Sequence, residues 1–168
     1  LSPRIHGLFA EQTDELLRYE RLLVRPDGLD VVLRDLQSKG AAGCNITVPF
    51  KEQAYQLCAQ RTPRAKWAQA GNTIQFAGDQ LVIDNTDGVG LVRDIVQKAG
   101  ISLEGKRVLL RGAGGAAARA LGALLDAKPA ALVLANHTRE RSVRLVARHR
   151  DYAKQIKPSR RLAATSLL

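Results

Sequence analysis

The chain has 168 residues, of which 45% are hydrophobic and 25% are charged, an ordinary composition for a soluble globular protein. No apolar run approaches the roughly 18 residues that a membrane-spanning helix requires, and the first residues do not form a signal peptide. The net charge of +10 resides in residues 101–168, which carry 14 Lys and Arg against 4 Asp and Glu, whereas residues 1–100 carry 12 against 12. Such a basic half suits phosphate-bearing ligands or nucleic acid.

Cysteine and histidine usage argues against disulfides and metals. The two cysteines, Cys44 and Cys58, are too few for a disulfide framework, and we expect both thiols in the core of a cytoplasmic protein. No second cysteine or histidine stands at metal-ligand spacing, so we expect no metal site. We expect His6 to be structural and His149 to face solvent.

Hydrophobic periodicity predicts alternating helices and strands in the first half of the chain. The predicted elements are a helix from Ser2 to about residue 15, a strand over 18–24, a helix from Pro26 to about residue 40, a strand over 44–48, a helix over 51–59 with Ala54, Leu57 and Cys58 inward, a short helix over 62–71, two strands over 72–77 and 81–84 joined by a turn, and a helix after Asp84–Gly88 that runs to about residue 98. We expect these strands to be mainly parallel with helical crossovers.

The second half reads as one dinucleotide-binding βαβ unit. The predicted elements are a strand over 106–111, a glycine loop over 112–116, a helix to about residue 127, a strand over 131–135, a helix over 140–147 and the start of a further strand over 162–166. Beyond His149 the helical periodicity fades. The predicted fold class is therefore α/β, with an N-terminal α/β domain over 1–86 and a partial Rossmann-type dinucleotide-binding domain over 87–168.

The stretch from Asn45 to Lys51 carries the first candidate site residues. Asn45 and Thr47 are two residues apart, so on a strand their side chains share one face. Pro49 ends the strand and leaves Lys51 just past it. An amide, a hydroxyl and an ammonium so arranged suit a small hydroxylated or carboxylated ligand.

Lys51 and Asp87 are the natural pair for proton transfer during hydride chemistry, because a carboxylate beside an ammonium keeps it charged and oriented. Taken alone, Asp87 could be only the N-cap of its helix and Lys51 only a surface lysine. Taken together with Asn45, Thr47 and Asn72, those interpretations lose ground. Ser2 either caps the first helix or reaches the ligand cleft.

The glycine loop predicts a nucleotide site, since it follows a strand and opens a helix, although a tight strand–helix turn alone would look the same. Its residues are Gly112, Ala113, Gly114, Gly115 and Ala116. The end of the next strand carries no acid at the position that would bind a ribose hydroxyl, which favours NADP over NAD. The residues offered there are Asn136, His137, Thr138, Arg139 and Arg141, unless the two arginines form only a solvated helix start.

At these residues the chain resembles the shikimate dehydrogenase family. The matching pieces, in the family's order, are Ser2–His6, Asn45–Lys51, Gly71–Thr73, Asp84–Gly88, Gly112–Ala116 and Asn136–Arg141. The resemblance implies reversible, NADPH-dependent reduction of 3-dehydroshikimate to shikimate, in a cytoplasmic enzyme that could form a homodimer. It implies Lys51 and Asp87 as the catalytic pair, with Ser2, Asn45, Thr47 and Asn72 as substrate contacts and the two later segments as the NADP site.

The chain also departs from the family pattern. His137 stands where the family usually has an arginine that contacts the 2′-phosphate, and a neutral imidazole contributes less there. The family's first strand and its closing elements have no counterpart, so we expect a fragment truncated at both ends. Two alternatives follow: a catalytically impaired module that binds nucleotide or RNA, although nucleic acid is the less favoured partner, and a quinate/shikimate dehydrogenase that uses NAD.

Overall fold

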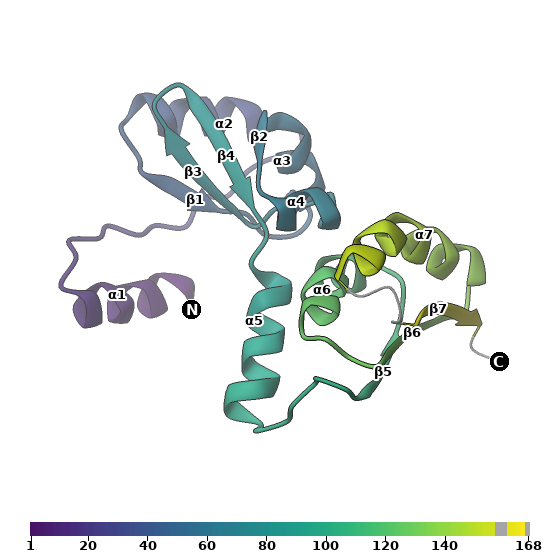
Figure 1. Ribbon diagram of the computed structural model, residues 1–168. Coiled ribbons are helices and arrows are strands. Elements are labelled where there is room, and N and C mark those ends of the chain that lie inside the picture. The colour runs from purple at the N-terminus through teal and green to yellow at the C-terminus, as the bar shows by residue number, and fades with distance from the viewer. Residues whose placement is uncertain (157–160, 167–168) are drawn as a thin grey trace.

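The computed structural model describes residues 1–156 and 161–166. Two sheets form its framework, a four-stranded sheet of order β1-β3-β4-β2 and a three-stranded sheet of order β5-β6-β7. Helix α5 (Asp87–Arg93) runs on from the last strand of the first sheet and leads to the second half (Figure 1). The α/β fold class predicted from the sequence is confirmed.

The first half holds most of its predicted elements at nearly the predicted bounds. They are helices α1 (Ser2–Thr13), α2 (Leu29–Ser38), α3 (Lys51–Leu57) and α4 (Pro63–Ala68), and strands β1 (Gly43–Asn45), β3 (Thr73–Ala77) and β4 (Gln80–Asp84). The two-residue strand β2 (Gln60–Arg61) was not predicted. Local chemistry explains the boundaries. In α4, Pro63 occupies the first turn and the Thr62 hydroxyl accepts a hydrogen bond from the Ala65 amide at 3.2 Å.

The expectation of mainly parallel strands in this half was wrong. Strand β3 pairs antiparallel with both β1 and β4, and only the short β2 runs parallel to β4. The reason is the tight turn at Gly78, which takes φ +59° and folds β4 directly back on β3. That hairpin itself was predicted.

Three local predictions also fail in the first half. Residues 18–24 have no regular structure, because no described strand pairs with them and an unpaired ladder is not stable. Helix α1 is capped by Leu1, so Ser2 is its first helical residue and not its N-cap. Leu57, expected inward, lies at the last residue of α3 and is 40% exposed.

Strand β1 ends at Asn45, three residues earlier than predicted. Ile46 continues the pairing through one hydrogen bond from its amide to the Asn72 carbonyl, and the chain then turns at residues 48–50 with a cis peptide between Val48 and Pro49. Asn45 and Thr47 therefore do not lie on one strand face. The turn leads directly into α3 at Lys51.

The second half has the predicted parallel arrangement. It contains π-helical turn η1 (Asp94–Lys98), strands β5 (Arg107–Arg111), β6 (Ala131–Asn136) and β7 (Arg161–Ser166), and helices α6 (Gly115–Asp126) and α7 (Arg139–Ile156). The three strands pair in parallel, with β6 in the centre, as in one half of a Rossmann fold. Helix α7 is longer than predicted.

His149 lies on α7, and its burial corrects the prediction that it faces solvent. It is 0% exposed, and with Leu145 and Ala153 it forms a buried row at four-residue spacing. Its Nδ1 lies 3.0 Å from the Leu145 carbonyl, while its Nε2 is buried and has no hydrogen-bond partner among the described residues. Burial lowers the pKa of His149 to about 4, with the charge of Arg148 acting in the same direction and the Leu145 hydrogen bond opposing it.

Two apolar clusters make the core, one for each half. The first surrounds Leu33, Ile74 and Ile83 and includes the fully buried Cys58, with Cys44 packed against it; burial raises the pKa of both thiols to about 11, as expected for core cysteines. The second lies between α6, α7 and the parallel sheet. The single tryptophan, Trp67 on α4, packs against Tyr152 of α7 at 4.7 Å between ring centroids.

Helix α5 crosses α6 at a glycine. A Cβ at Gly88 would lie 2.5 Å from the Arg119 carbonyl oxygen and 3.0 Å from Ala123 Cβ, so only glycine permits this approach. Gly90, on the same helix, has open space around it. The close contact fixes the start of α5 against α6.

We predict that Gly88→Ala lowers the free energy of unfolding by about 2 kcal/mol, because the backbone of α6 must move to admit the methyl group. The matched variant Gly90→Ala should raise stability by about 0.5–1 kcal/mol, since alanine is the better helix former. Chemical denaturation of both variants measures the difference. Equal stability of the two would contradict the close approach of α5 and α6.

We predict that the free energy of unfolding decreases as the pH is lowered below about 6.5, and that His149 causes this decrease. Its folded pKa lies below the unfolded value, so the unfolded state binds the proton first, and the stabilisation present above pH 6.5 is lost as pH falls towards 4. By pH 4.5 the loss should reach about 2 kcal/mol, and His149→Met should remove this component. Urea denaturation between pH 7 and 4.5 checks it, with exposed His137→Met as the control.

Candidate active site

Lys51 and Asp87 meet as predicted. The Lys51 ammonium, at the first residue of α3, donates a hydrogen bond to Asp87 Oδ2 at 2.6 Å. Asp87 is the first residue of α5, where a carboxylate is stabilised by the positive end of the helix. Their side chains are 15% and 30% exposed, so water screens the pair only in part.

A third charge joins the pair. The Arg119 Nε, from α6, lies 2.7 Å from the same Asp87 Oδ2, and the side chain is 15% exposed. Burial raises the pKa of the Asp87 carboxyl, but the hydrogen bond and charge of Lys51, the charge of Arg119 and the hydrogen bond from Asn72 outweigh it and hold that pKa below its usual value. The carboxylate therefore stays ionised.

Asn72 and Asn85 hold the backbone that carries Asp87. Asn72 Nδ2 donates to Asp87 Oδ1 at 2.8 Å, and its Oδ1 accepts from the Thr86 amide at 3.0 Å. Asn85 is 2% exposed; its Nδ2 donates to the Ala70 carbonyl at 2.9 Å and its Oδ1 accepts from the Asp87 amide at 3.1 Å. These bonds tie the turn after β4 to the loop before β3, and so place the carboxylate opposite Lys51.

The other predicted substrate contacts are placed less tightly. Asn45 accepts a hydrogen bond from the Tyr19 hydroxyl at 2.9 Å, and its Nδ2 lies 3.4 Å from the Asn72 carbonyl oxygen. Thr47 and Ser2 are exposed, and in the described part of the chain no side-chain hydrogen bond joins either to Lys51 or Asp87. Helix α1, with Ser2 at its start, lies apart from the sheet in Figure 1.

The glycine loop sits at the end of β5 as predicted. Gly112 takes φ +105°, a conformation that favours glycine, and its amide donates to the Ala135 carbonyl at 2.7 Å. Asn136 Oδ1 accepts from the Ala113 amide at 3.2 Å, while its Nδ2 donates to the Thr138 carbonyl at 2.8 Å. Asn136 thus holds the loop, and α6 starts at Gly115 with its first amides free of side-chain caps.

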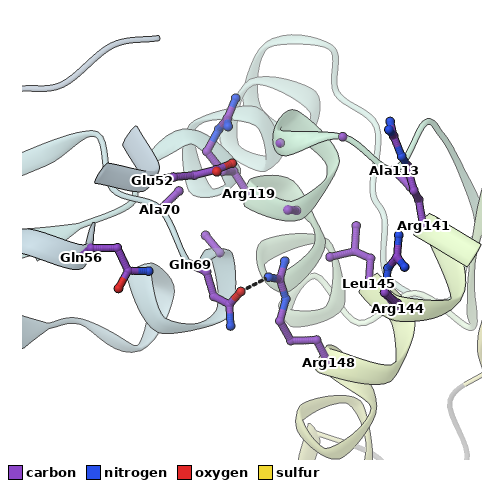
Figure 2. A pocket seen from close by; sticks show the side chains of 14 residues that line it. Glu52, Gln56, Gln69, Ala70, Ala113, Arg119, Arg141, Arg144, Leu145 and Arg148 are labelled. Atoms are coloured by element: carbon purple, nitrogen blue, oxygen red, sulfur yellow. Dashed lines mark hydrogen bonds between the residues drawn. The ribbon is translucent and has the colours of Figure 1, made fainter. Parts of the chain in front are cut away.

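A cleft of about 750 Å³ lies between α3, the loop after α4, the glycine loop and α7. Four arginines line it, and Figure 2 shows Arg119 on one wall and the others along α7; they are Arg119, Arg141, Arg144 and Arg148. Arg148 donates to Gln69 Oε1 at 2.5 Å across the cleft, a bond drawn in Figure 2. Among the described residues that line the cleft, Glu52 is the one acid.

Among the residues proposed at the end of β6, the structure brings Arg141 into this cleft. His137, Thr138 and Arg139 are exposed and are not among its lining residues. Sequence reasoning missed Arg119, Arg144 and Arg148. Arg119 follows Gly115 by four residues, and Arg144 and Arg148 follow Arg141 by three and seven. Helical spacing counted from the glycine loop and from Arg141 could therefore have identified all three.

Across residues 1–156 and 161–166, no group of three His, Cys, Asp or Glu side chains could hold a metal ion. Within the same residues, no helix is long and apolar enough to cross a bilayer.

We predict that Asn85→Ala lowers the free energy of unfolding by about 2 kcal/mol, because the Ala70 carbonyl and the Asp87 amide lose their buried partner. Exposed Gln75→Ala, on β3, should change stability by no more than about 0.5 kcal/mol. Denaturant titration compares the two. An Asn85 variant as stable as the Gln75 variant would show that the turn does not need this side chain.

A family model supports the resemblance first seen in the sequence. Residues 1–74 match the model described as the shikimate dehydrogenase substrate binding domain. This match covers helix α1, the Asn45–Lys51 stretch and Asn72.

Similar proteins extend beyond that segment. The "Shikimate dehydrogenase (NADP(+))" of Methylobacillus flagellatus is 50% identical over 149 residues, which are 89% of this chain and 55% of that protein. The crystal structure of an Ael1 enzyme from Pseudomonas putida superposes with a TM-score of 0.88 at 37% identity, over 98% of this chain and 58% of that one. Shikimate 5-dehydrogenase from Thermus thermophilus, in complex with NADP(H) and shikimate, gives a TM-score of 0.79 at 27% identity, over 98% of this chain and 57% of that one.

The chain spans about half the length of the curated relatives it matches. Within that span, the fold, the order of the matched segments and the sequence identity all indicate similarity to the same group of proteins. Over the part of their length that it covers, the chain is similar to shikimate dehydrogenases.

Proposed function

We propose that this protein catalyses the reversible, NADPH-dependent reduction of 3-dehydroshikimate to shikimate, a step towards the aromatic amino acids. The contact between Lys51 Nζ and Asp87 Oδ2, at 2.6 Å and partly buried, is the observation that carries the proposal. It supplies the proton chemistry that a carbonyl reduction requires. Relatives named shikimate dehydrogenase (NADP(+)) support the choice of substrate and cofactor.

Lys51 is the proton donor in this proposal. Reduction adds a hydride to the carbonyl carbon and a proton to its oxygen, and the Lys51 ammonium delivers that proton; in the reverse direction the neutral amine takes it back. Asp87 stays ionised because its pKa is held low. It therefore orients the Lys51 ammonium and does not itself donate a proton to the substrate. Asn72 donates to the other Asp87 oxygen and keeps the carboxylate plane fixed.

The residues at the second half fit NADP. In the described part of the chain no side chain caps the amides at the start of α6, beside Gly114 and Gly115, and they suit a pyrophosphate, while the cleft arginines suit a further phosphate. Bound NADPH supplies the hydride. We assign Arg141 to the 2′-phosphate and Asn136 to holding the glycine loop. His137, Thr138 and Arg139 are exposed beside Arg141 and remain assigned to the same cofactor site.

For the substrate we assign Asn45, Thr47, Asn72 and Ser2 to its hydroxyl and carboxylate groups, in a substrate domain over residues 1–86 next to a nucleotide domain over 87–168. Asn72 is already bonded to Asp87, which would place the reacting carbon beside Lys51. A cytoplasmic homodimer belongs to the same proposal, and light scattering on the purified protein tests its mass.

We predict that Lys51→Met lowers kcat for shikimate oxidation at least about a thousandfold, because the variant has no group to accept the proton. NADPH affinity and thermal stability should stay within about twofold and 2 °C of the parent protein. Initial rates with NADP and fluorescence titration with NADPH measure both. Substantial activity in this variant would contradict the catalytic assignment.

We predict that Arg141→Gln weakens NADPH binding about tenfold and leaves NADH binding unchanged, because only NADPH carries the 2′-phosphate. Arg150→Gln is the matched control, since Arg150 lies on α7 outside the cleft. Titration of each variant with both nucleotides gives the ratio of dissociation constants. Equal loss of both nucleotides would assign Arg141 to the shared part of the cofactor instead.

A further inference from the structure

Two cations share one oxygen in the site. Lys51 Nζ lies 2.6 Å and Arg119 Nε lies 2.7 Å from Asp87 Oδ2. Only the lysine contact has hydrogen-bond geometry, since Arg119 Nε is buried and makes no hydrogen bond to any residue that the structure describes. Arg119 therefore contacts the carboxylate through its charge while this N–H donor stays unused.

The backbone of Arg119 is fixed beside Asp87. Its carbonyl oxygen lies where a Cβ at Gly88, the residue after Asp87, would come within 2.5 Å. The contact between α5 and α6 thus sets the separation of the carboxylate and the guanidinium. A shift of either helix would change both the charge contact and the packing.

The far end of the same side chain lies on the glycine loop. Arg119 Nη1 is 2.7 Å from the position that a Cβ at Gly115 would take, so the guanidinium covers the first turn of α6. Gly114 and Gly115 line the cleft with Arg119. One planar group therefore spans the distance between the carboxylate and the surface that faces an incoming phosphate.

We propose that Arg119 is a positioning residue that couples the phosphates of the dinucleotide to Asp87. A pyrophosphate at the glycine loop accepts hydrogen bonds from the guanidinium, whose fork suits two phosphate oxygens. The phosphates and the Asp87 carboxylate then compete for one cation, and bound cofactor leaves the carboxylate mainly to Lys51 and Asn72. The inference rests on the proposed function, since it requires the loop to bind the cofactor.

This coupling is reciprocal. Phosphate bound to Arg119 weakens its attraction to Asp87, and a change that weakens the attraction to Asp87 strengthens the binding of phosphate. The charge of Arg119 contributes to the low pKa of Asp87, which agrees with a working attraction between the two. The groups that face Asp87 are Lys51 from α3, Arg119 from α6 and Asn72 from the loop before β3. Glu52 adds a negative charge at the cleft wall near Gly115.

A double-mutant cycle on NADPH binding tests the inference. Arg119→Met should raise the dissociation constant about tenfold, and Asp87→Asn should lower it about fivefold while Arg119 is present. In the Arg119→Met background, Asp87→Asn should change it less than about twofold. Fluorescence titration of the purified protein measures all four forms without any need for turnover.

Controls separate coupling from structural damage. Arg150→Met, outside the cleft, should leave both the dissociation constant and the Asp87→Asn effect unchanged, and Arg119→Lys should restore part of the affinity because it keeps the charge. If Arg119→Met does not fold, as judged by thermal unfolding, Arg119→Gln replaces it in the same cycle. Asp87→Asn effects of equal size in both backgrounds overturn the inference alone, whereas a parent protein that binds no NADPH overturns the proposed function as well.

Discussion

The carboxylate of Asp87 is the point on which the site depends. It begins α5, accepts hydrogen bonds from Lys51 and Asn72, and carries the charge of Arg119. These partners come from α3, the loop before β3 and α6, so one anion joins elements from both halves of the chain. A buried carboxylate with a single partner would tend to take up a proton; here several donors keep it charged.

The packing of α5 on α6 serves the same end. Because Gly88 has no side chain, α6 comes close enough for Arg119 to reach the residue before it. Asn85, on the other side of Asp87, is buried and satisfies backbone groups of two loops. The backbone positions of the charged residues are thus fixed by packing and hydrogen bonds, so the side chains meet without a large conformational search.

Much of this could be predicted from the sequence. The glycine loop, the hairpin at Gly78 and the Lys51–Asp87 pair each have a local signal: a strand–loop–helix context, a turn residue, or a family segment. What failed depended on partners distant in the chain. Residues 18–24 have a strand-like pattern but no ladder to join, and β1 ends early because the chain turns before Pro49.

Helix faces were the other source of error. His149 and Arg119 are polar residue types that usually face water, yet each continues a row set by its helix: His149 four residues after Leu145, and Arg119 four after Gly115. His149 was predicted to face solvent, and Arg119 was not considered among the candidate site residues. Which polar residues on a helix are buried is decided by the element packed against it, and the sequence does not state that element.

The contact of Trp67 with Tyr152 has a practical meaning beyond packing. Trp67 belongs to the first half and Tyr152 to α7, so the sole indole of the chain sits at the seam between them. Its fluorescence is a native optical probe of that seam: any rocking of one half against the other alters the surroundings of a single chromophore, and no label has to be attached to follow it.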